Sequence, residues 1–287
     1  MSVRIITDSG SDITAKEAIA HDNLAVLPLS VNFGDEVYHD GADLTHERFY
    51  ELLVESDELP TTGQVNPFAF GEAIREVREA GDEAVVITLS SKLSGTYESA
   101  VAAASEFKGG VHVVDSKNVT VGERILVEYA LRLAADGIGA ADIACALEQA
   151  REDVFVIGLL DTLEYLKRGG RIPAAAATLG NLLSLKPVIS IEDGVVSLLG
   201  KARGSKNGRN LLNQFVEKAG GIDFSMPLAL GYAGLTDSLL QKYIADSRNI
   251  WGGAVTDGGL PVHSVGATIG THVGPGAIAL AFFKLAE

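Results

Sequence analysis

The chain has 287 residues, and 47% of them are hydrophobic, which is enough to form the core of one large or two medium domains. Its 23 basic and 38 acidic side chains give a formal net charge of −15. Because such a charge repels nucleic acids and anionic lipids, we expect no nucleic-acid partner and at most transient contact with a membrane.

The N-terminal run and the cysteine content bear on the compartment of the protein. The sequence begins with a strand-like run at residues 3–7, so we expect no signal peptide. No apolar run approaches the roughly 18 residues of a membrane span. Cys145 is the only cysteine, so an internal disulfide is excluded, and no metal-type spacing of Cys and His is present. We therefore expect a cytoplasmic protein without a metal site.

The first half of the chain alternates strand-like and helix-like runs. Apolar or alternating runs predict strands at 3–7, 24–33, 36–39, 83–89 and 111–114. Helical spacing predicts helices at 14–21, 47–56, 67–80, 96–107, 122–136 and 140–152. This order of elements predicts a mostly parallel sheet that helices cover on both faces.

A second unit begins near residue 154. We expect strands at 154–160, 188–191, 195–199, 228–232, 262–269 and 278–283. Helices are expected at 162–167, 173–184, 207–219 and 237–250. The predicted fold class is therefore α/β with two α/β domains, residues 1–153 and 154–287.

A turn rich in small polar residues, Ser90–Tyr97, connects a predicted strand to a predicted helix. Parallel sheets offer ligand sites at such turns, because the unpaired N–H groups and partial positive charge of a helix N-terminus attract anions. Ser94 adds a hydroxyl group, and Gly95 lets a ligand approach the backbone. The turn is a candidate site for a carboxylate or phosphate. Alternatively, Ser94 only caps the helix, which is worth roughly 1 kcal/mol.

His272 differs from the other histidines in its local sequence. It lies in the glycine-rich segment 270–276, which we expect to be a turn between two strands. Histidines in such turns often serve function, although a structural role in the loop explains this one equally well.

Two arginines, Arg168 and Arg171, flank a pair of glycines in this acidic chain. One interpretation is a helix end, with glycine stopping the helix and cations at its negative pole. The other is an exposed guanidinium pair that contacts a phosphate or an acidic partner.

Taken together, the sequence resembles the DegV family of bacterial fatty-acid-binding proteins, which work with a fatty acid kinase. The resemblance covers essentially the whole chain and depends on the order of its motifs rather than on one of them. The motifs are Thr7–Ser9, Thr62–Gln64, Ser90–Tyr97, Val114–Ser116, Asp161–Leu166, Arg168–Ile172, Leu185–Val188 and His272–Gly276.

The resemblance implies one long-chain fatty acid held between the two domains. Its carboxylate would be bound by Thr62 and Ser94, with backbone around Gly95 and with His272 nearby. The acyl chain would lie in an apolar tunnel mainly in the second domain. From their composition, residues 174–177 and strand 265–269 are candidate walls, although ordinary helix and strand packing explains both equally well. A separate ATP-dependent kinase would phosphorylate the bound carboxylate, so this protein would be a carrier without catalytic residues or cofactor.

The resemblance also implies a partner-facing set of cations, Arg168, Arg171 and Arg203. The sequence departs from the family pattern in two places, one beside the ligand head group and one in the partner-facing charge. The run Thr62–Asn66 lacks a serine that the family often has, and the run 203–206 carries less positive charge than is usual.

Two other functions stay open on the residues alone. One is a serine hydrolase that cleaves an acyl ester through Ser94, although the turn does not match the G-x-S-x-G motif and no His–Asp pair is assignable. The other is a binding module for a different small anion, such as a phosphorylated metabolite.

Overall fold

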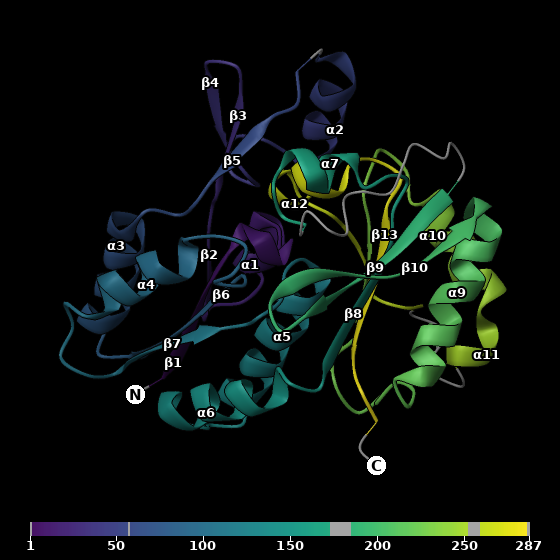
Figure 1. The fold of residues 1–287 in the computed structure, drawn as a ribbon. Helices are drawn as coiled ribbons and strands as arrows, with labels where there is room; N and C mark the ends of the chain where they lie inside the picture. Colours follow the sequence, from purple (N-terminus) through teal and green to yellow (C-terminus); the bar gives the residue numbers. More distant parts are fainter. Residues whose placement is uncertain (1, 57, 173–184, 252–258, 286–287) are drawn as a thin grey trace.

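The computed structural model describes residues 2–56, 58–172, 185–251 and 259–285. Two large sheets lie side by side, and a small sheet stands above them (Figure 1). The described helices are α1 (Ala15–Ile19), α2 (His46–Glu55), α3 (Pro67–Glu79), α4 (Thr96–Ala104), α5 (Val121–Ala135), α6 (Ala140–Ala150), α7 (Glu164–Arg168), α9 (Gly204–Lys218), α10 (Ser238–Asp246), α11 (Arg248–Trp251) and α12 (Ala267–Val273), with the 3-10 turn η1 (Ser9–Ser11).

The first sheet has the order β2-β1-β6-β7, and all of its pairings are parallel. Its strands are β1 (Val3–Asp8), β2 (Leu24–Leu27), β6 (Glu83–Thr88) and β7 (Val111–Asp115). Helices α3 and α4 pack on one face, and α5 and α6 pack on the other (Figure 1). The predicted parallel sheet with helices on both faces is therefore confirmed.

The second sheet has the order β10-β9-β8-β13-β11-β12, and only its β11–β12 pairing is parallel. Its strands are β8 (Val154–Leu159), β9 (Leu185–Glu192), β10 (Val195–Arg203), β11 (Ala229–Tyr232), β12 (Val262–Ser264) and β13 (Ile278–Phe283). Helix α5 packs against strands of both large sheets, so its apolar face joins the two halves through one core. The boundary at residue 153 stays a prediction.

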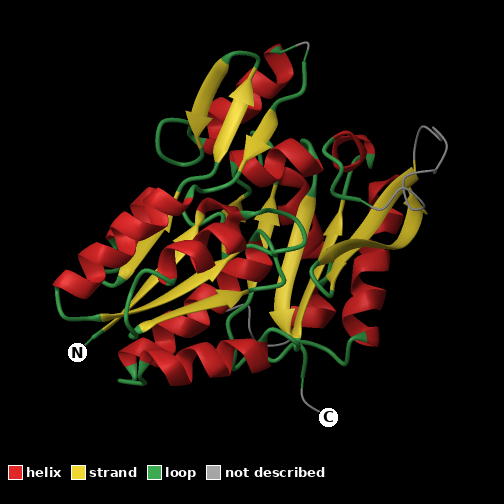
Figure 2. Ribbon diagram, turned by 60° about the vertical axis from the view of Figure 1, so that its left-hand side comes forward, coloured by secondary structure: helices red, strands yellow, loops and turns green. Residues whose placement is uncertain are grey.

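The small antiparallel sheet has the order β4-β3-β5, and with α2 it stands above the two larger sheets (Figure 2). Its strands are β3 (Ser30–Phe33), β4 (Glu36–His39) and β5 (Thr61–Gly63). Helix α12 of the second half contacts α2, β3 and β5. This lobe therefore connects the first half of the chain to a helix near its end.

The predicted strand 24–33 is wrong, because it is two strands in different sheets, β2 and β3. Pro28 lies between them, and proline lacks the N–H group that a sheet ladder needs. The next N–H, of Leu29, donates to the side chain of Ser9 at 3.0 Å. The chain therefore leaves the parallel sheet at Pro28 and enters the small lobe.

The predicted strand 262–269 is also wrong after its third residue. The chain turns at Gly266 and continues as α12, so His272 lies at the end of a helix and not in a turn between strands. The β-branched residues of this run favour a strand locally, but distant carboxylates bind the first N–H groups of α12. Tertiary contacts therefore decide the structure here.

Two smaller differences concern a helix and a break, and one predicted helix is not tested. The predicted helix 237–250 is interrupted at Ser247 and forms α10 and α11. The predicted break at 60–64 contains the short strand β5. The predicted helix 173–184, including the candidate tunnel wall 174–177, lies outside the described residues.

Candidate ligand-binding site

A cavity of about 380 Å³ lies between the two halves of the chain. From the first half it is lined by β5, by the turn after β6 and by residues before α5. The second half contributes β8, β9, β10, α12 and β13. This volume is within the usual range for small-molecule sites.

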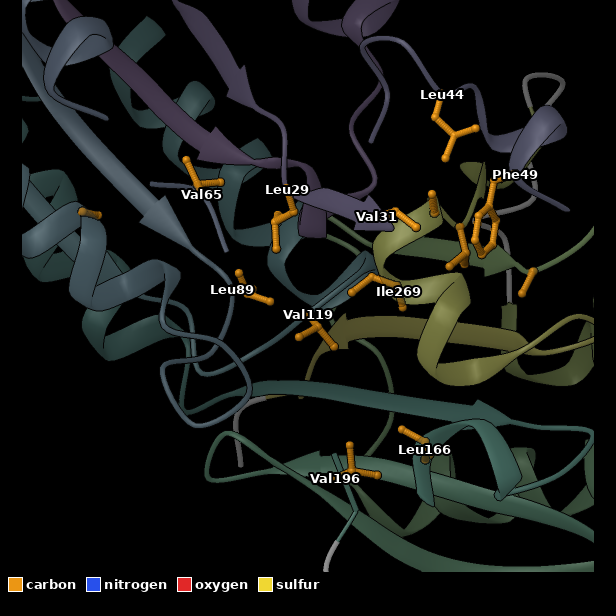
Figure 3. Packing of buried hydrophobic residues seen from close by; sticks show 14 of the residues in the cluster. Leu29, Val31, Leu44, Phe49, Val65, Leu89, Val119, Leu166, Val196 and Ile269 are labelled. Carbon is orange, nitrogen blue, oxygen red and sulfur yellow. The ribbon is translucent and has the colours of Figure 1, made fainter. Parts of the chain in front are cut away.

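The walls of the cavity are largely apolar. Leu29, Leu89, Val119 and Ile269 come from four different segments and point toward one another (Figure 3). Strands of the second sheet add residues such as Val156, Ile191, Val196 and Ala279. A surface of this kind suits a hydrocarbon ligand, because burying apolar groups is its main source of affinity.

A hydrogen bond between Thr62 and His272 joins the small lobe to α12 at the cavity wall. The Thr62 Oγ1 atom lies 2.9 Å from His272 Nε2, and both residues line the cavity. Their separation in the sequence is 210 residues. The structure thus brings together two of the predicted site residues.

The imidazole of His272 is neutral at physiological pH. Burial, together with the nearby Arg171 guanidinium, lowers the pKa of His272 from 6.5 to about 4. Its Nδ1 atom is buried without a hydrogen-bond partner among the described residues. An unpaired N–H costs more than an unpaired acceptor, so we assign the proton to Nε2, which donates to Thr62 Oγ1. The hydroxyl proton of Thr62 is then free for a ligand in the cavity.

This protonation state predicts a pH dependence of stability. Between pH 4 and 6.5 the unfolded chain binds the His272 proton and the folded chain does not, so this residue adds stability as pH rises. As pH rises from 4 to 6.5, the unfolding free energy of wild type should therefore increase relative to that of His272→Gln, by at most about 3 kcal/mol. Denaturant titrations of both proteins without ligand measure it.

The subtraction removes other groups that titrate nearby. Burial raises the pKa values of Asp8 and Asp12 to about 7, but these residues are present in both proteins and cancel in the difference. A difference that stays constant from pH 4 to 6.5 would show that His272 is not held neutral by its surroundings.

The turn after β6 is fixed by two acidic side chains at the end of the parallel sheet. Asp8 accepts hydrogen bonds from the N–H groups of Gly10 and Leu89, and Asp115 accepts from the backbone and hydroxyl of Ser91. These contacts hold the turn in place before the ligand arrives. The carboxyl ends of parallel strands thus build a ligand-facing loop, as expected.

Ser94 and Gly95 lie in this turn and line the cavity. The Ser94 Oγ atom accepts from the Thr96 N–H at 3.3 Å and lies 2.9 Å from Thr96 Oγ1, so Ser94 contributes to the start of α4. A Cβ atom at Gly95 would lie 2.2 Å from Gln64 Oε1. Gly95 is therefore needed for the close approach of Gln64, which the sequence interpretation did not assign to the site although it lies in a quoted motif.

The three predicted partner-facing arginines lie in different places. Arg171 is half-buried and lines the cavity, where its Nε donates to the Leu93 carbonyl at 3.2 Å. It is therefore not one of two exposed guanidiniums. Arg168 is 63% exposed and pairs with Glu164, and Arg203 is exposed at the end of β10.

The glycines between Arg168 and Arg171 have separate functions. Gly170 has φ +68, the left-handed conformation that ends a helix, so the predicted helix stop is correct for this residue. Gly169 has an ordinary helical conformation. A Cβ atom at Gly169 would lie 2.2 Å from His272 Nδ1, so its missing side chain makes room for the imidazole.

Two features are absent from the described residues. None of the helices there is long and apolar enough to cross a membrane. No group of three or more His, Cys, Asp or Glu side chains in these ranges is arranged to hold a metal ion.

The fold and site define an α/β protein with a ligand cavity between two sheets. The DegV family model, described as "Uncharacterised protein, DegV family", matches residues 2–285. The chain belongs to the DegV family. Relatives include DegV domain-containing proteins of Caldanaerobacter subterraneus, 32% identical over 98% of both chains, and of Deinococcus radiodurans, 32% identical over 99% of both chains.

Solved structures of the family have the same fold. A DegV family protein from Thermus thermophilus, described by its fatty acid binding, is 34% identical with a TM-score of 0.85 and covers 99% of this chain and 100% of its own. DegV of Bacillus subtilis, described as a fatty acid binding protein, is 28% identical with a TM-score of 0.80 and the same coverage. A stearic acid-binding protein from Eubacterium ventriosum is 25% identical, with a TM-score of 0.83 over 98% of both chains.

Proposed function

We propose that this protein binds one long-chain fatty acid in the cavity, with its carboxylate at Thr62 and Ser94. The proposal depends on one observation: the cavity has apolar walls except in one place, where several polar side chains lie next to one another. Thr62 contacts His272, whose neighbour Arg171 donates to the carbonyl of Leu93, next to Ser94. Such a site matches a ligand with a long apolar chain and one charged end.

The affinity would come mainly from the acyl chain. Burying each methylene group is worth roughly 0.8 kcal/mol, so a long chain outweighs the cost of association. The hydroxyl groups of Thr62 and Ser94 and the backbone at Gly95 would then determine where the carboxylate lies. The Arg171 guanidinium adds a positive charge beside it, which favours the ionised head group.

The relatives support a fatty acid as the ligand. The family members from Thermus thermophilus, Bacillus subtilis and Eubacterium ventriosum are described as binding fatty acids, and each covers essentially this whole chain. The apolar walls favour a long-chain acid over a small anionic metabolite, which would leave them uncovered.

We infer further that the protein is a cytoplasmic, non-catalytic carrier that presents the carboxylate to a separate ATP-dependent fatty acid kinase for phospholipid metabolism. The charge distribution supports a partner of this kind. Residues 167–206 contain seven basic and two acidic side chains, whereas the whole chain carries −15. Arg168 and Arg203 in this segment are exposed, and their positive charges would attract an acidic surface or a nucleotide phosphate.

The described contacts do not support hydrolysis by Ser94. A serine nucleophile needs a histidine base within hydrogen-bond reach. Ser94 Oγ contacts Thr96, whereas the imidazole of His272 contacts Thr62. The carrier function therefore fits this arrangement better than a serine hydrolase does.

Displacement of a bound fluorescent fatty acid tests the proposal. With cis-parinaric acid as the probe, palmitic and oleic acid should displace it, methyl oleate should be at least tenfold weaker, and acetate or inorganic phosphate should not compete. Competition by phosphate as strong as that by oleic acid would instead support a small-anion site. Turnover of a long-chain nitrophenyl ester that Ser94→Ala abolishes would support the hydrolase.

The partner-facing assignment predicts a kinetic effect of Arg168→Ala. Bound fatty acid should be unchanged, stability should fall by at most about 1 kcal/mol, and the apparent KM of the kinase for the carrier should rise. Added salt should raise the apparent KM measured with wild type toward that of the variant, because salt screens exposed charges. Steady-state rates with the cognate kinase at several carrier concentrations measure this.

Arg75→Ala is the matched control for that variant. Arg75 is also an exposed helix residue paired with a glutamate, Glu72, but it lies on α3 outside the basic segment. Equal kinetics for both variants and wild type, at low and moderate salt, would remove the partner contact and leave Arg168 as part of a helix end.

A further inference from the structure

Helix α12 begins with three N–H groups that two buried carboxylates bind. Gly266 donates to Asp12 Oδ1 at 2.8 Å, and the N–H groups of Ala267 and Thr268 donate to the two oxygens of Asp40, each at 2.9 Å. Asp12 and Asp40 are 1% and 2% exposed. Both come from the first 40 residues of the chain, more than 220 residues before α12.

Asp40 is the stronger of the two caps. Burial, and to a smaller degree the nearby Asp40 carboxylate, raises the pKa of Asp12 to about 7, so Asp12 is partly protonated at neutral pH. Asp40 binds two donors at once and lies at the positive end of the helix dipole. Its own backbone N–H donates to the Leu29 carbonyl at 2.9 Å, which fixes it to the small lobe.

These bonds decide where α12 begins. The preceding residues form strand β12, and the sequence alone favours a longer strand. A seven-residue helix cannot satisfy its own first N–H groups, so their partners must come from outside it. Asp40 supplies two of them and so sets the starting residue of the helix.

The position of the first turn determines the position of His272 at the other end. The middle of the helix is held against α2, because Gly270 packs on Phe49 and Tyr50 with no room for a Cβ atom. Tyr50 Oη also donates to the Val265 carbonyl at 3.1 Å. A shift or fraying of the first turn would therefore move the imidazole of His272 relative to Thr62.

We propose that Asp40 is a positioning residue for the ligand head group, acting through α12 on the Thr62–His272 hydrogen bond. The expected effect on ligand binding depends on the proposed fatty-acid site. The effect of Asp40 on the position of His272 does not. Asp40 touches neither the cavity nor a ligand in it, and no motif of the sequence marked it.

Asp40→Asn is the principal test, with Asp43→Asn as the control. The amide keeps the shape of Asp40 but replaces one acceptor by a donor, so it cannot accept from both N–H groups. Asp43 lies in the same segment, is 54% exposed and pairs only with His39 among the described residues. We expect at least tenfold weaker binding of cis-parinaric acid for Asp40→Asn and no change for Asp43→Asn.

A second readout does not require a ligand. In protein labelled with ¹⁵N-histidine, the His272 signal is identified by its absence in His272→Gln. In wild type it should show the neutral Nε2–H form down to about pH 4. In Asp40→Asn the midpoint of the His272 titration should move toward pH 6.5, because the imidazole loses its bond to Thr62 and becomes less buried. An unchanged His272 titration would overturn the proposal, whether or not fatty acid binds.

Two further variants separate positioning from general stability. Asp40→Asn should cost less than threefold in binding when Thr62 is already valine, because both changes remove the same hydrogen bond. If Asp40→Asn weakened binding as much in the Thr62→Val background as it does in wild type, the inference would be overturned. If Asp40→Asn does not fold, Ala267→Pro removes one donor at the first helical position, where proline is tolerated, and should shift binding and titration in the same direction. A variant with unchanged affinity and titration would contradict it.

Discussion

Replacing Thr62 by valine should weaken fatty-acid binding by roughly ten- to a hundredfold. The change keeps the shape of the side chain but removes the hydroxyl that contacts His272 and that, in the proposed site, would donate to the carboxylate. A hydrogen bond to a charged group contributes about 1.5–3 kcal/mol, and each 1.4 kcal/mol is about tenfold in affinity. Burial of the acyl chain should keep part of the ligand bound, and Ser94→Ala should act in the same direction. Displacement of cis-parinaric acid by oleic acid measures both variants.

Thr61→Val is the control for this prediction. Thr61 precedes Thr62 on β5, but its side chain is exposed and contacts Asn32 rather than the cavity. It should bind like wild type. Equal affinity of Thr62→Val and Thr61→Val, with equal output of acyl phosphate at limiting carrier, would show that the carboxylate lies elsewhere.

Gly169→Ala should abolish or weaken binding by more than tenfold while the fold is kept. The new Cβ atom would lie 2.2 Å from His272 Nδ1 and 2.8 Å from its Cε1, so the ring has to move. The Tyr165 carbonyl of the same helix, 3.2 Å from the new Cβ atom, makes the site tighter still. Moving the ring breaks the bond to Thr62. Binding assays and a melting curve on the same sample measure both effects.

Gly170→Ala provides a matched comparison one residue away. Nothing lies within 4 Å of its Cβ position, but its φ of +68 is unfavourable for alanine and should cost about 1–2 kcal/mol of stability. Its affinity should be normal. If Gly169→Ala and Gly170→Ala lost affinity equally, the double glycine would be only a helix end, as one sequence interpretation had it.

Much of the fold follows from local sequence. The β-branched runs that form β1, β6 and β7 predict buried parallel strands, and Pro67 at the first position of α3 marks that helix correctly. Local signals work here because the hydrophobic pattern and the tertiary structure agree. Pro28 marks the end of β2, whereas the alternating pattern around it favours one longer strand.

At α12, tertiary contacts outweigh local propensity. Val265, Thr268 and Ile269 favour a strand, yet Asp40 binds the N–H groups that make this segment helical. No pattern near residue 40 or residue 267 shows that these two positions meet. Val265, Thr268 and Ile269 of the predicted strand do line the cavity, but the last two belong to helix α12.

The local sequence marks the turn at Ser94 and Gly95 and the glycine-rich segment around His272 as candidates, but only the family resemblance joins them with Thr62 in one site. Thr62, Ser94, Gly95 and His272 all line the cavity, although neither spacing nor periodicity connects Thr62 with His272. Arg171 is not exposed as expected for a partner-facing residue, because its side chain turns toward Leu93 and binds the Leu93 carbonyl. A charged residue among glycines does not show which way its side chain points.

Native mass spectrometry of the protein purified from cells, with no lipid added, tests the central claim most directly. The account predicts a noncovalent adduct with the mass of a long-chain fatty acid, which is released on denaturation and reduced in Thr62→Val but not in Thr61→Val. Protein at its sequence mass alone, from cells supplied with fatty acids, or an adduct with the mass of a phosphorylated metabolite, would contradict it.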